Sequence, residues 1–428
     1  MKIRSLRIFP TLLLLFLAVS ALSACGGHEH TVSGWIMQPK ATCTSIGHRI
    51  KKCLSCNEIL EEEDYNTSHS YEEGFCIYCK RPQRDESHLK YAAVTIDGKE
   101  GYAVTGIGSS NAVDMVIPEK HNSLPVLAIA ENAFVQCVNL VSVTVPKTVV
   151  AIGDRAFYAC TALTTVTFAS GSACTEIGVF AFAECESLRT ATIPAGVTTL
   201  SDSLFSGCVE LKTLNLYGNI TAVGADAFGN CKKLTTREEN GAIYLGSKAN
   251  PYMILYGVAD RTVSALTVNE STLVIGPAAL AGCSGLTALT LPESVVSISP
   301  YAFSGCASLS LLTLPSALRS LGAYALQDCR ALTALTLPSG LAEIGTGAFY
   351  GCTALATLTL PESLTSVGAA AFYGCSALQF NAHGHGRYLG TAANPYFLLC
   401  GFDDIAAADT PHPDNRLVAA DADKTPIA

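Results

Sequence analysis

The spacing of ten cysteines restricts the fold of this chain more than any other feature of its sequence. The positions of successive members of the series differ by 23, except for one difference of 25 and one of 52. A constant period in the twenties is typical of a solenoid, in which every repeat forms one rung and packs only on its neighbours. The series comprises Cys137, Cys160, Cys185, Cys208, Cys231, Cys283, Cys306, Cys329, Cys352 and Cys375.

Each repeat carries the same pattern of apolar residues. One repeat reads Ile344-Gly345-x-x-Ala348-Phe349-x-x-Cys352-x-x-Leu355-x-x-Leu358-x-Leu360-Pro361. The alternation Leu358-x-Leu360 predicts a short strand, which ends at the proline because proline has no backbone N–H to donate. No repeat can bury its own apolar side, so we expect stacked rungs with interior columns of Leu, Phe and Cys. The predicted fold is a mainly parallel β repeat solenoid, with rungs joined by short turns or by 3-10 or helical pieces.

A longer repeat is superimposed on the short one. The sequence Tyr244-Leu245-Gly246…Asn250-Pro251-Tyr252 returns as Tyr388-Leu389-Gly390…Asn394-Pro395-Tyr396, with every position shifted by 144. The ten rungs therefore fall into two five-rung blocks. The first block carries Cys137 to Cys231, the second carries Cys283 to Cys375, and each is followed by one Tyr-Leu-Gly…Asn-Pro-Tyr element.

The recurring Ala-Phe-x-x-Cys-x-x-Leu and Ile-Gly motifs resemble the BspA-type leucine-rich-repeat family of bacterial surface proteins. The resemblance covers about residues 91–402. It implies an N-terminal cap at residues 91–128, with a hairpin turn around residues 97–101, and a leucine-rich-repeat solenoid at residues 129–402. It also implies a protein without enzymatic activity that acts in adhesion or in binding extracellular macromolecules.

The interior cysteines are predicted to be buried thiols and not disulfides. Rungs stack about 4.8 Å apart, and in-register Cβ atoms keep that separation, whereas a disulfide needs Cβ atoms about 3.8 Å apart. Bridges along the column would therefore distort it. Cys174 and Cys400 lie outside this series, and the pattern does not account for them.

Residues 1–24 have the features of an export signal. Lys2, Arg4 and Arg7 precede an apolar run at residues 8–22, which is too short and too asymmetrically flanked for a spanning helix. The end of the run, Leu22-Ser23-Ala24-Cys25, resembles the lipobox of bacterial lipoproteins. That resemblance implies a mature N-terminus at residues 25–27 that is anchored to a membrane by lipid on Cys25, with the rest outside the cytoplasm. An ordinary secretory peptide with a chance cysteine is the alternative.

Residues 28–80 form a segment rich in Cys and His, followed by a linker at residues 81–90. Two pairs, Cys53-x-x-Cys56 and Cys76-x-x-Cys79, give the arrangement C-x2-C-x19-C-x2-C, which is typical of structural zinc sites. The segment resembles zinc-ribbon-type modules, and it has too few apolar residues to fold on burial alone. Disulfides are the alternative, although the fifth cysteine, Cys43, would stay unpaired. Whether Cys43 or His69 also binds the metal stays open.

Charge and motifs exclude several classes of function. The chain has 36 acidic and 27 basic residues, a net charge of −9, which disfavours nucleic-acid binding. The repeats contain no Gly-x-Ser-x-Gly motif, phosphate loop or carboxylate pair. His383-x-His385 suits polar surface better than a metal site. A zinc-dependent enzyme that uses the cysteine-histidine segment is therefore a remote alternative.

Threonine recurs at one outward position of the predicted strands. The column includes Thr144, Thr167, Thr192, Thr290, Thr313, Thr336 and Thr359. Threonine is favoured on any sheet because it is β-branched, but the column also forms a hydroxyl-lined face for a protein or glycan. Thr290, Thr313, Thr336 and Thr359, where charges are few, are the candidate ligand-binding residues. A structural envelope spacer that binds nothing specific is the alternative function.

Residues 403–428 are rich in Ala, Asp and Pro and are expected to be a mobile tail. Within them, Arg416-Leu417-Val418-Ala419 matches Thr272-Leu273-Val274-Ile275 and resembles the start of another rung.

Overall fold

The computed structural model describes residues 36–37, 47–52, 59–65, 71–72, 75–76, 89–108, 113–383, 386–395, 397–402 and 415–419. The chain divides into two units, Met1–Arg84 and Asp85–Ala428. The described strands of the first unit are β1 (Ile36–Met37), β2 (Gly47–Lys52), β3 (Ile59–Tyr65), β4 (Tyr71–Glu72) and β5 (Phe75–Cys76). They pair antiparallel as a β1-β2-β3 sheet and a β4-β5 hairpin.

The second unit opens with an antiparallel hairpin of β6 (Lys90–Ile96) and β7 (Lys99–Gly106). Its turn residues Asp97 and Gly98 both have positive φ, as a tight two-residue hairpin turn requires. The expected hairpin around residues 97–101 is therefore present. β7 then pairs parallel with β10 (Leu124–Ile129), which lies beside the short β9 (Lys120–His121), so the hairpin covers the first rung.

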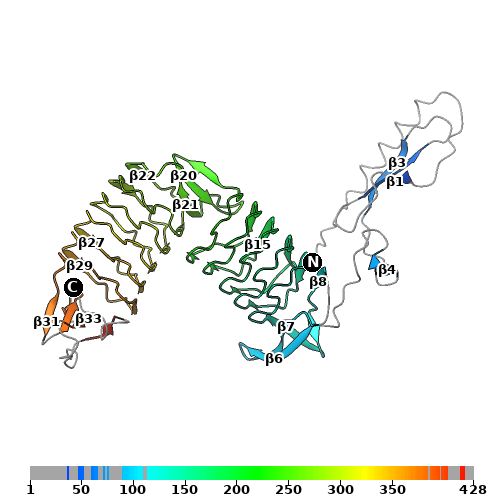
Figure 1. Cartoon of the computed structure of the whole chain (residues 1–428), viewed down its shortest axis with the longest axis horizontal. Coiled ribbons are helices and arrows are strands. Elements are labelled where there is room, and N and C mark those ends of the chain that lie inside the picture. Colours follow the sequence, from blue (N-terminus) through cyan, green and yellow to red (C-terminus); the bar gives the residue numbers. More distant parts are fainter. Residues whose placement is uncertain are drawn as a thin grey trace, which may run out of the picture. The chain divides into compact units, whose positions relative to one another are not determined.

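Each rung that follows contributes strands to two rows, and Figure 1 shows the rungs stacked in chain order. The Ile-Gly row contains β12 (Ala151–Ile152), β14 (Glu176–Ile177), β16 (Thr199–Leu200), β18 (Ala222–Val223), β21 (Ile254–Val258), β23 (Val274–Ile275), β25 (Ser297–Ile298), β26 (Ser320–Leu321), β28 (Glu343–Ile344) and β30 (Ser366–Val367). The Leu-x-Leu row contains β8 (Asp114–Val116), β11 (Ser142–Val145), β13 (Thr165–Phe168), β15 (Thr190–Ile193), β17 (Thr213–Leu216), β22 (Ala265–Thr267), β24 (Ala288–Thr290), β27 (Ala334–Thr336) and β29 (Thr357–Thr359).

The register confirms the leucine-rich-repeat solenoid. Neighbouring strands of both rows are parallel, and typical partners such as Ser320 and Glu343 lie one cysteine period apart in the sequence. In the described part of the chain, turns join the strands and no helix occurs, so the helical pieces that the sequence left open are absent there. The Ile-Gly row runs without a break from β21 to β30, whereas in the second block the Leu-x-Leu row is reduced to the pairs β22-β24 and β27-β29.

The two Tyr-Leu-Gly…Asn-Pro-Tyr elements form equivalent antiparallel sheets. The first comprises β19 (Arg237–Glu239), β20 (Ala242–Leu245) and β21, and the second comprises β31 (Asn381–His383), β32 (Gly386–Leu389) and β33 (Leu398–Phe402). β21 continues into the next rung by parallel pairing of Ile254 with Val274, and β33 does so by pairing Leu398 with Leu417 of β34 (Leu417–Val418). Part of the segment expected to be a mobile tail is therefore a strand, as its match to residues 272–275 indicated.

The Phe column of the first block is an unbroken ring stack. Successive rings of Phe134, Phe157, Phe182, Phe205 and Phe228 have centroids 5.0, 5.3, 5.7 and 6.2 Å apart and are nearly parallel. These rings are almost fully buried. In the second block, Leu280 and Leu326 interrupt the column, leaving a single stacked pair, Phe349 and Phe372, at 5.5 Å.

The cysteine column consists of free thiols, as predicted. In eight rungs the Sγ atom donates a hydrogen bond of 3.0–3.3 Å to the carbonyl oxygen of the residue at the Phe position one rung earlier. Cys185, for example, donates to Phe157 O at 3.2 Å. Cysteine therefore fills a small space and also supplies a hydrogen-bond donor, which alanine could not do.

The two cysteines outside the series are also buried. Cys174 occupies the core position that Val149 holds in the rung before it and Val197 in the rung after it. Its Sγ donates to Glu176 O at 3.4 Å. Cys400 lies in β33, and burial raises the pKa of its thiol.

Candidate binding surfaces

The predicted lipid and zinc residues are not tested by the structure. Cys25, Cys53, Cys56 and Cys79 lie outside the described residues, and Cys76 belongs to β5, whose side chains are not described. Cys43 and His69 also lie outside. The described residues contain no cluster of three or more His, Cys, Asp or Glu side chains suited to a metal ion. Within the same residues, no helix has the length and apolar character to cross a membrane.

The predicted threonine face is exposed. Thr290, Thr313, Thr336 and Thr359 are all accessible to solvent. Thr336 pairs directly with Thr359 across β27 and β29, so the hydroxyls follow one line over neighbouring rungs. Neither of the two pockets described below includes these four residues.

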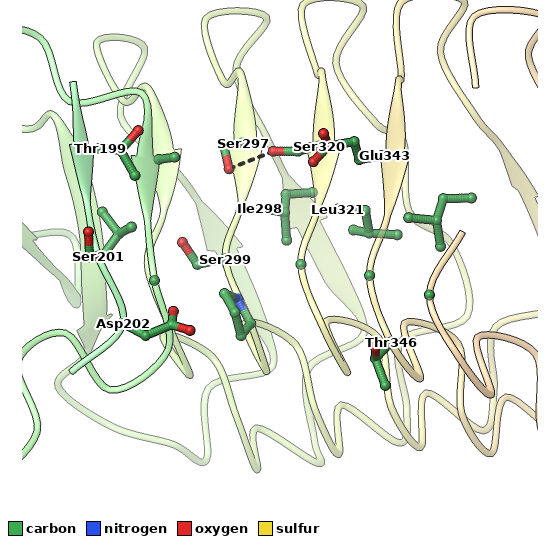
Figure 2. A pocket seen from close by; sticks show the side chains of 18 of the residues that line it. Thr199, Ser201, Asp202, Ser297, Ile298, Ser299, Ser320, Leu321, Glu343 and Thr346 are labelled. Carbon is green, nitrogen blue, oxygen red and sulfur yellow. Dashed lines mark hydrogen bonds between the residues drawn. The ribbon is translucent and has the colours of Figure 1, made fainter. Parts of the chain in front are cut away.

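A groove of about 430 Å³ crosses the Ile-Gly row, between strands of both blocks (Figure 2). Its polar side chains are mostly hydroxyls. They comprise Thr199, Ser201, Ser297, Ser299, Ser320, Thr346 and Ser366, together with the carboxylates of Asp202 and Glu343. The groove therefore offers many hydrogen-bonding groups, and its only charges are negative.

Three serines of this groove show how it is constructed. Ser297 and Ser320 share a hydrogen bond of 3.0 Å between their hydroxyls, which Figure 2 shows as a dashed line. Ser201 Oγ donates to Ile177 O at 2.5 Å. Ser299 is 2% exposed, and its Oγ has no partner in the described part of the chain.

Ser201 and Ser299 stand where other rungs have the glycine of the Ile-Gly motif. At Gly345, a Cβ atom would lie 2.4 Å from the backbone nitrogen of Ala323, so adjacent rungs approach closely at this position. A serine there must displace its neighbours slightly, and it places a hydroxyl in the groove. The sequence signal for the groove is therefore the pair of breaks in the Ile-Gly motif, which the motif analysis did not use.

A second pocket, of about 550 Å³, opens on the Leu-x-Leu row of the first block. It lies over β13 and β15 and is bordered by Tyr217, which is 70% exposed. Thr167 and Thr192 of the threonine column line this pocket. The column was correctly located, but its concave part lies in the first block and not at the four residues chosen in the second.

A row of tyrosines follows the turns of the second block. Tyr301 and Tyr324 stack with ring centroids 5.2 Å apart, and Tyr350 and Tyr373 stack at 5.0 Å. Tyr301 and Tyr373, at the two ends, are 40% and 37% exposed. The rings cover each other's faces, so the row presents mainly ring edges and hydroxyls to solvent.

The family follows from the repeats themselves. The model of the BspA type leucine-rich repeat region matches residues 118–245 and 260–393 in six copies. The chain belongs to this family. The matched ranges contain both five-rung blocks and both pockets, and they confirm the family that the Ala-Phe-x-x-Cys-x-x-Leu motif indicated.

Several solved structures are similar to the chain. A leucine rich cell surface protein from Faecalibacterium prausnitzii is 25% identical, with a TM-score of 0.33, covering 74% of this chain and 94% of that one. The pneumococcal vaccine antigen PcpA is 18% identical, with a TM-score of 0.34, covering 67% and 87%. A leucine-rich repeat protein from Bacteroides ovatus is 23% identical, with a TM-score of 0.25, covering 68% and 92%. No curated protein matches the chain.

Proposed function

We propose that this protein is a lipid-anchored bacterial cell-surface protein whose solenoid binds an extracellular macromolecule. The observation that supports this most directly is the groove on the Ile-Gly row, which extends over rungs from Thr199 to Ser366. Solenoids present extended surfaces whose residues can vary without disturbing the core. The groove therefore provides a binding surface that the stacking of the rungs does not itself require.

The lining of the groove favours a protein partner with basic side chains. Its hydroxyls can bond to peptide groups, and Asp202 and Glu343 are exposed at its edges. Opposite charges across an interface increase the association rate and the specificity more than the affinity. We expect binding that weakens as the salt concentration rises.

The experiment compares two matched surface variants of the purified mature protein. Thr199→Lys, Glu343→Lys and Ser366→Lys change exposed residues of the groove, and Thr290→Lys, Thr336→Lys and Thr359→Lys change the threonine face. Binding to immobilised matrix and plasma proteins should fall at least tenfold with the groove variant and remain with the other. The reverse result would assign binding to the threonine face. No saturable binding to any of these proteins would favour the spacer alternative.

The lipid anchor is tested in cells. Cys25→Ala should release the protein from membranes or block its maturation, because no acyl chain can then be attached at that position. Cell fractionation and mass spectrometry of the N-terminus provide the measurement. Unchanged membrane retention of the variant would contradict the anchor.

We also propose one structural zinc ion held by Cys53, Cys56, Cys76 and Cys79. Native mass spectrometry of the mature protein should show one zinc per chain, which a strong chelator removes. The control is Cys329→Ser, which changes a buried cysteine of the solenoid and should leave the zinc content unchanged. Two intact disulfides among the four ligands would rule the site out.

A further inference from the structure

The pocket on the Leu-x-Leu row of the first block results from a rung of irregular length. The interval from Cys160 to Cys185 exceeds the regular period by two, and the two extra residues follow β13. β11 pairs with β13 at four positions and β15 with β17 at four, but β13 pairs with β15 only at Thr165 and Thr190. The two strands therefore separate after their first residues, and the pocket opens where they separate.

Both walls of this pocket are held by backbone hydrogen bonds. On one side, the turn of residues 169–172 is closed by a bond from Ser172 N to Ala169 O at 3.1 Å, with Gly171 at a φ of 72° in its third position. On the other side, Tyr217 N donates to Ile193 O at 3.2 Å. Ala169 and Tyr217 occupy positions where neighbouring rungs have a proline, so both walls arise at departures from the repeat.

The floor of the pocket carries uncommitted hydroxyls. Thr165 and Thr167 are exposed, and Thr190 and Thr192 are half-buried. None of the four hydroxyls bonds to a described protein group, whereas the adjacent Thr164 Oγ1 donates to Val141 O at 3.0 Å. Phe168, Pro194 and the Tyr217 ring add apolar surface. No lining residue is charged.

This chemistry selects a small neutral ligand with many hydroxyls. An anionic ligand would find no lysine or arginine, and a purely apolar one would leave the threonine hydroxyls without partners. The walls come from rungs two steps apart, about 10 Å, which closes the pocket to an extended peptide running across the rungs. The volume of about 550 Å³ falls within the roughly 300–1,000 Å³ of small-molecule sites.

We propose that this pocket binds one neutral hexopyranose unit. The C–H face of the sugar ring lies against the exposed ring of Tyr217, and the sugar hydroxyls bond to the threonine floor. This site goes beyond the proposed function, because it is a small-ligand site on a different row of strands from the protein-binding groove.

The test is a titration of the mature protein with methyl hexosides of glucose, galactose and mannose, followed by saturation-transfer NMR and calorimetry. At about 0.3 kcal/mol per non-hydrogen atom, one such sugar should bind with a dissociation constant of order 1 mM. Neutral oligosaccharides ending in the preferred hexose distinguish a terminal glycan unit, which they bind at least as tightly, from a free monosaccharide, which they do not. A uronic acid of the same ring size should bind at least tenfold more weakly.

Matched variants locate the binding. Tyr217→Ala, and the pair Thr167→Val with Thr192→Val, should each weaken hexose binding at least tenfold. Their controls are Tyr301→Ala, and Thr313→Val with Thr336→Val, which make the same changes in the second block and should have no effect. Thermal unfolding checks that every variant is folded.

Two results would overturn the proposal: no saturable binding of any neutral hexoside, or binding that survives both first-block variants. Either leaves the proposed function untouched, because the groove variants test that function on separate residues. Loss of protein binding in Tyr217→Ala without any hexose binding would instead make the pocket part of a protein interface, and would also overturn the sugar site.

Discussion

The two blocks of the solenoid are built on one repeat and differ in opposite ways inside and outside. Inside, the first block has a continuous stack of five phenylalanines, while leucines interrupt the column of the second. Outside, the second block keeps the regular cysteine period throughout, and its threonine face contributes to neither pocket. The first block has the longer rung and a pocket above it.

This difference separates two roles of the sequence. Exchanging Phe for Leu inside the column, as at Leu326, leaves the stacking of the rungs intact because both side chains are buried and apolar. Two added residues outside the column separate β13 from β15. The solenoid therefore tolerates a change of core side chain and converts a change of rung length into surface shape.

The largest expected effect is common to both blocks and appears at alkaline pH. Burial raises the pKa of Cys185 in the first block and of Cys352 in the second to about 12. Unfolded thiols ionise near pH 8.5, so the buried thiols stabilise the fold fully below that pH and lose this contribution as the pH rises toward 12. Circular dichroism under reducing conditions should show one unfolding transition in this range. Separate transitions of the two blocks would show that the columns are independent.

The next effect concerns the ring stack. Phe182→Ala removes a buried ring that stacks on Phe157 and Phe205, and should reduce the free energy of unfolding by about 3–5 kcal/mol. Leu326→Ala, at the same position in the second block, should reduce it by about 1 kcal/mol less, because no ring stack is lost. Denaturant titration of both variants gives the comparison. Equal losses would mean that the stack adds nothing to burial.

A smaller effect on stability is expected from making the blocks alike in length. Deleting Ser170 and Gly171, both exposed, restores the regular cysteine period and should change the free energy of unfolding by no more than about 1 kcal/mol. Hexose binding should be lost, because one wall of the pocket is removed. Denaturant titration and calorimetry on the same sample measure both. Unfolding of the deletion variant would show that the longer rung is required by the core.

The smallest effect is expected on the flat face of the second block. Thr313→Lys places a charge on an exposed position and should change the stability by no more than about 0.5 kcal/mol. The melting temperature measures this change. A loss several times larger would mean that this face packs against another part of the molecule and cannot be a free surface.

The fold could be predicted because its information is periodic. Phe349 and Cys352 recur in neighbouring rungs at fixed offsets, and their burial follows from the stacking of identical turns. The exposure of Thr336 could be predicted in the same way, from the alternation of sides along a strand.

The binding surfaces could not be predicted from periodicity because they lie where it fails. Ser299 replaces a glycine of the Ile-Gly motif, and Tyr217 replaces a proline. The effect of each depends on how neighbouring rungs move apart or accommodate the new side chain. A repeating pattern describes the average rung and contains no information on that adjustment. The longer interval between Cys160 and Cys185 was visible in the sequence, but the direction in which the extra residues project was not.

The column of free thiols has a consequence for how the chain must reach its folded state. In the solenoid, Cys329 is fully buried, and its pKa is raised well above the usual range, so oxidants find almost no thiolate to attack. The unfolded chain exposes the same sulfurs as ordinary thiols, any two of which can form a bridge that prevents the rungs from stacking. In oxidising surroundings, the yield of native protein is therefore decided by a race between stacking and sulfur oxidation. A chain whose rungs close from their neighbours, one contact at a time, is well placed to win that race, since each new rung shields its own thiol as it forms.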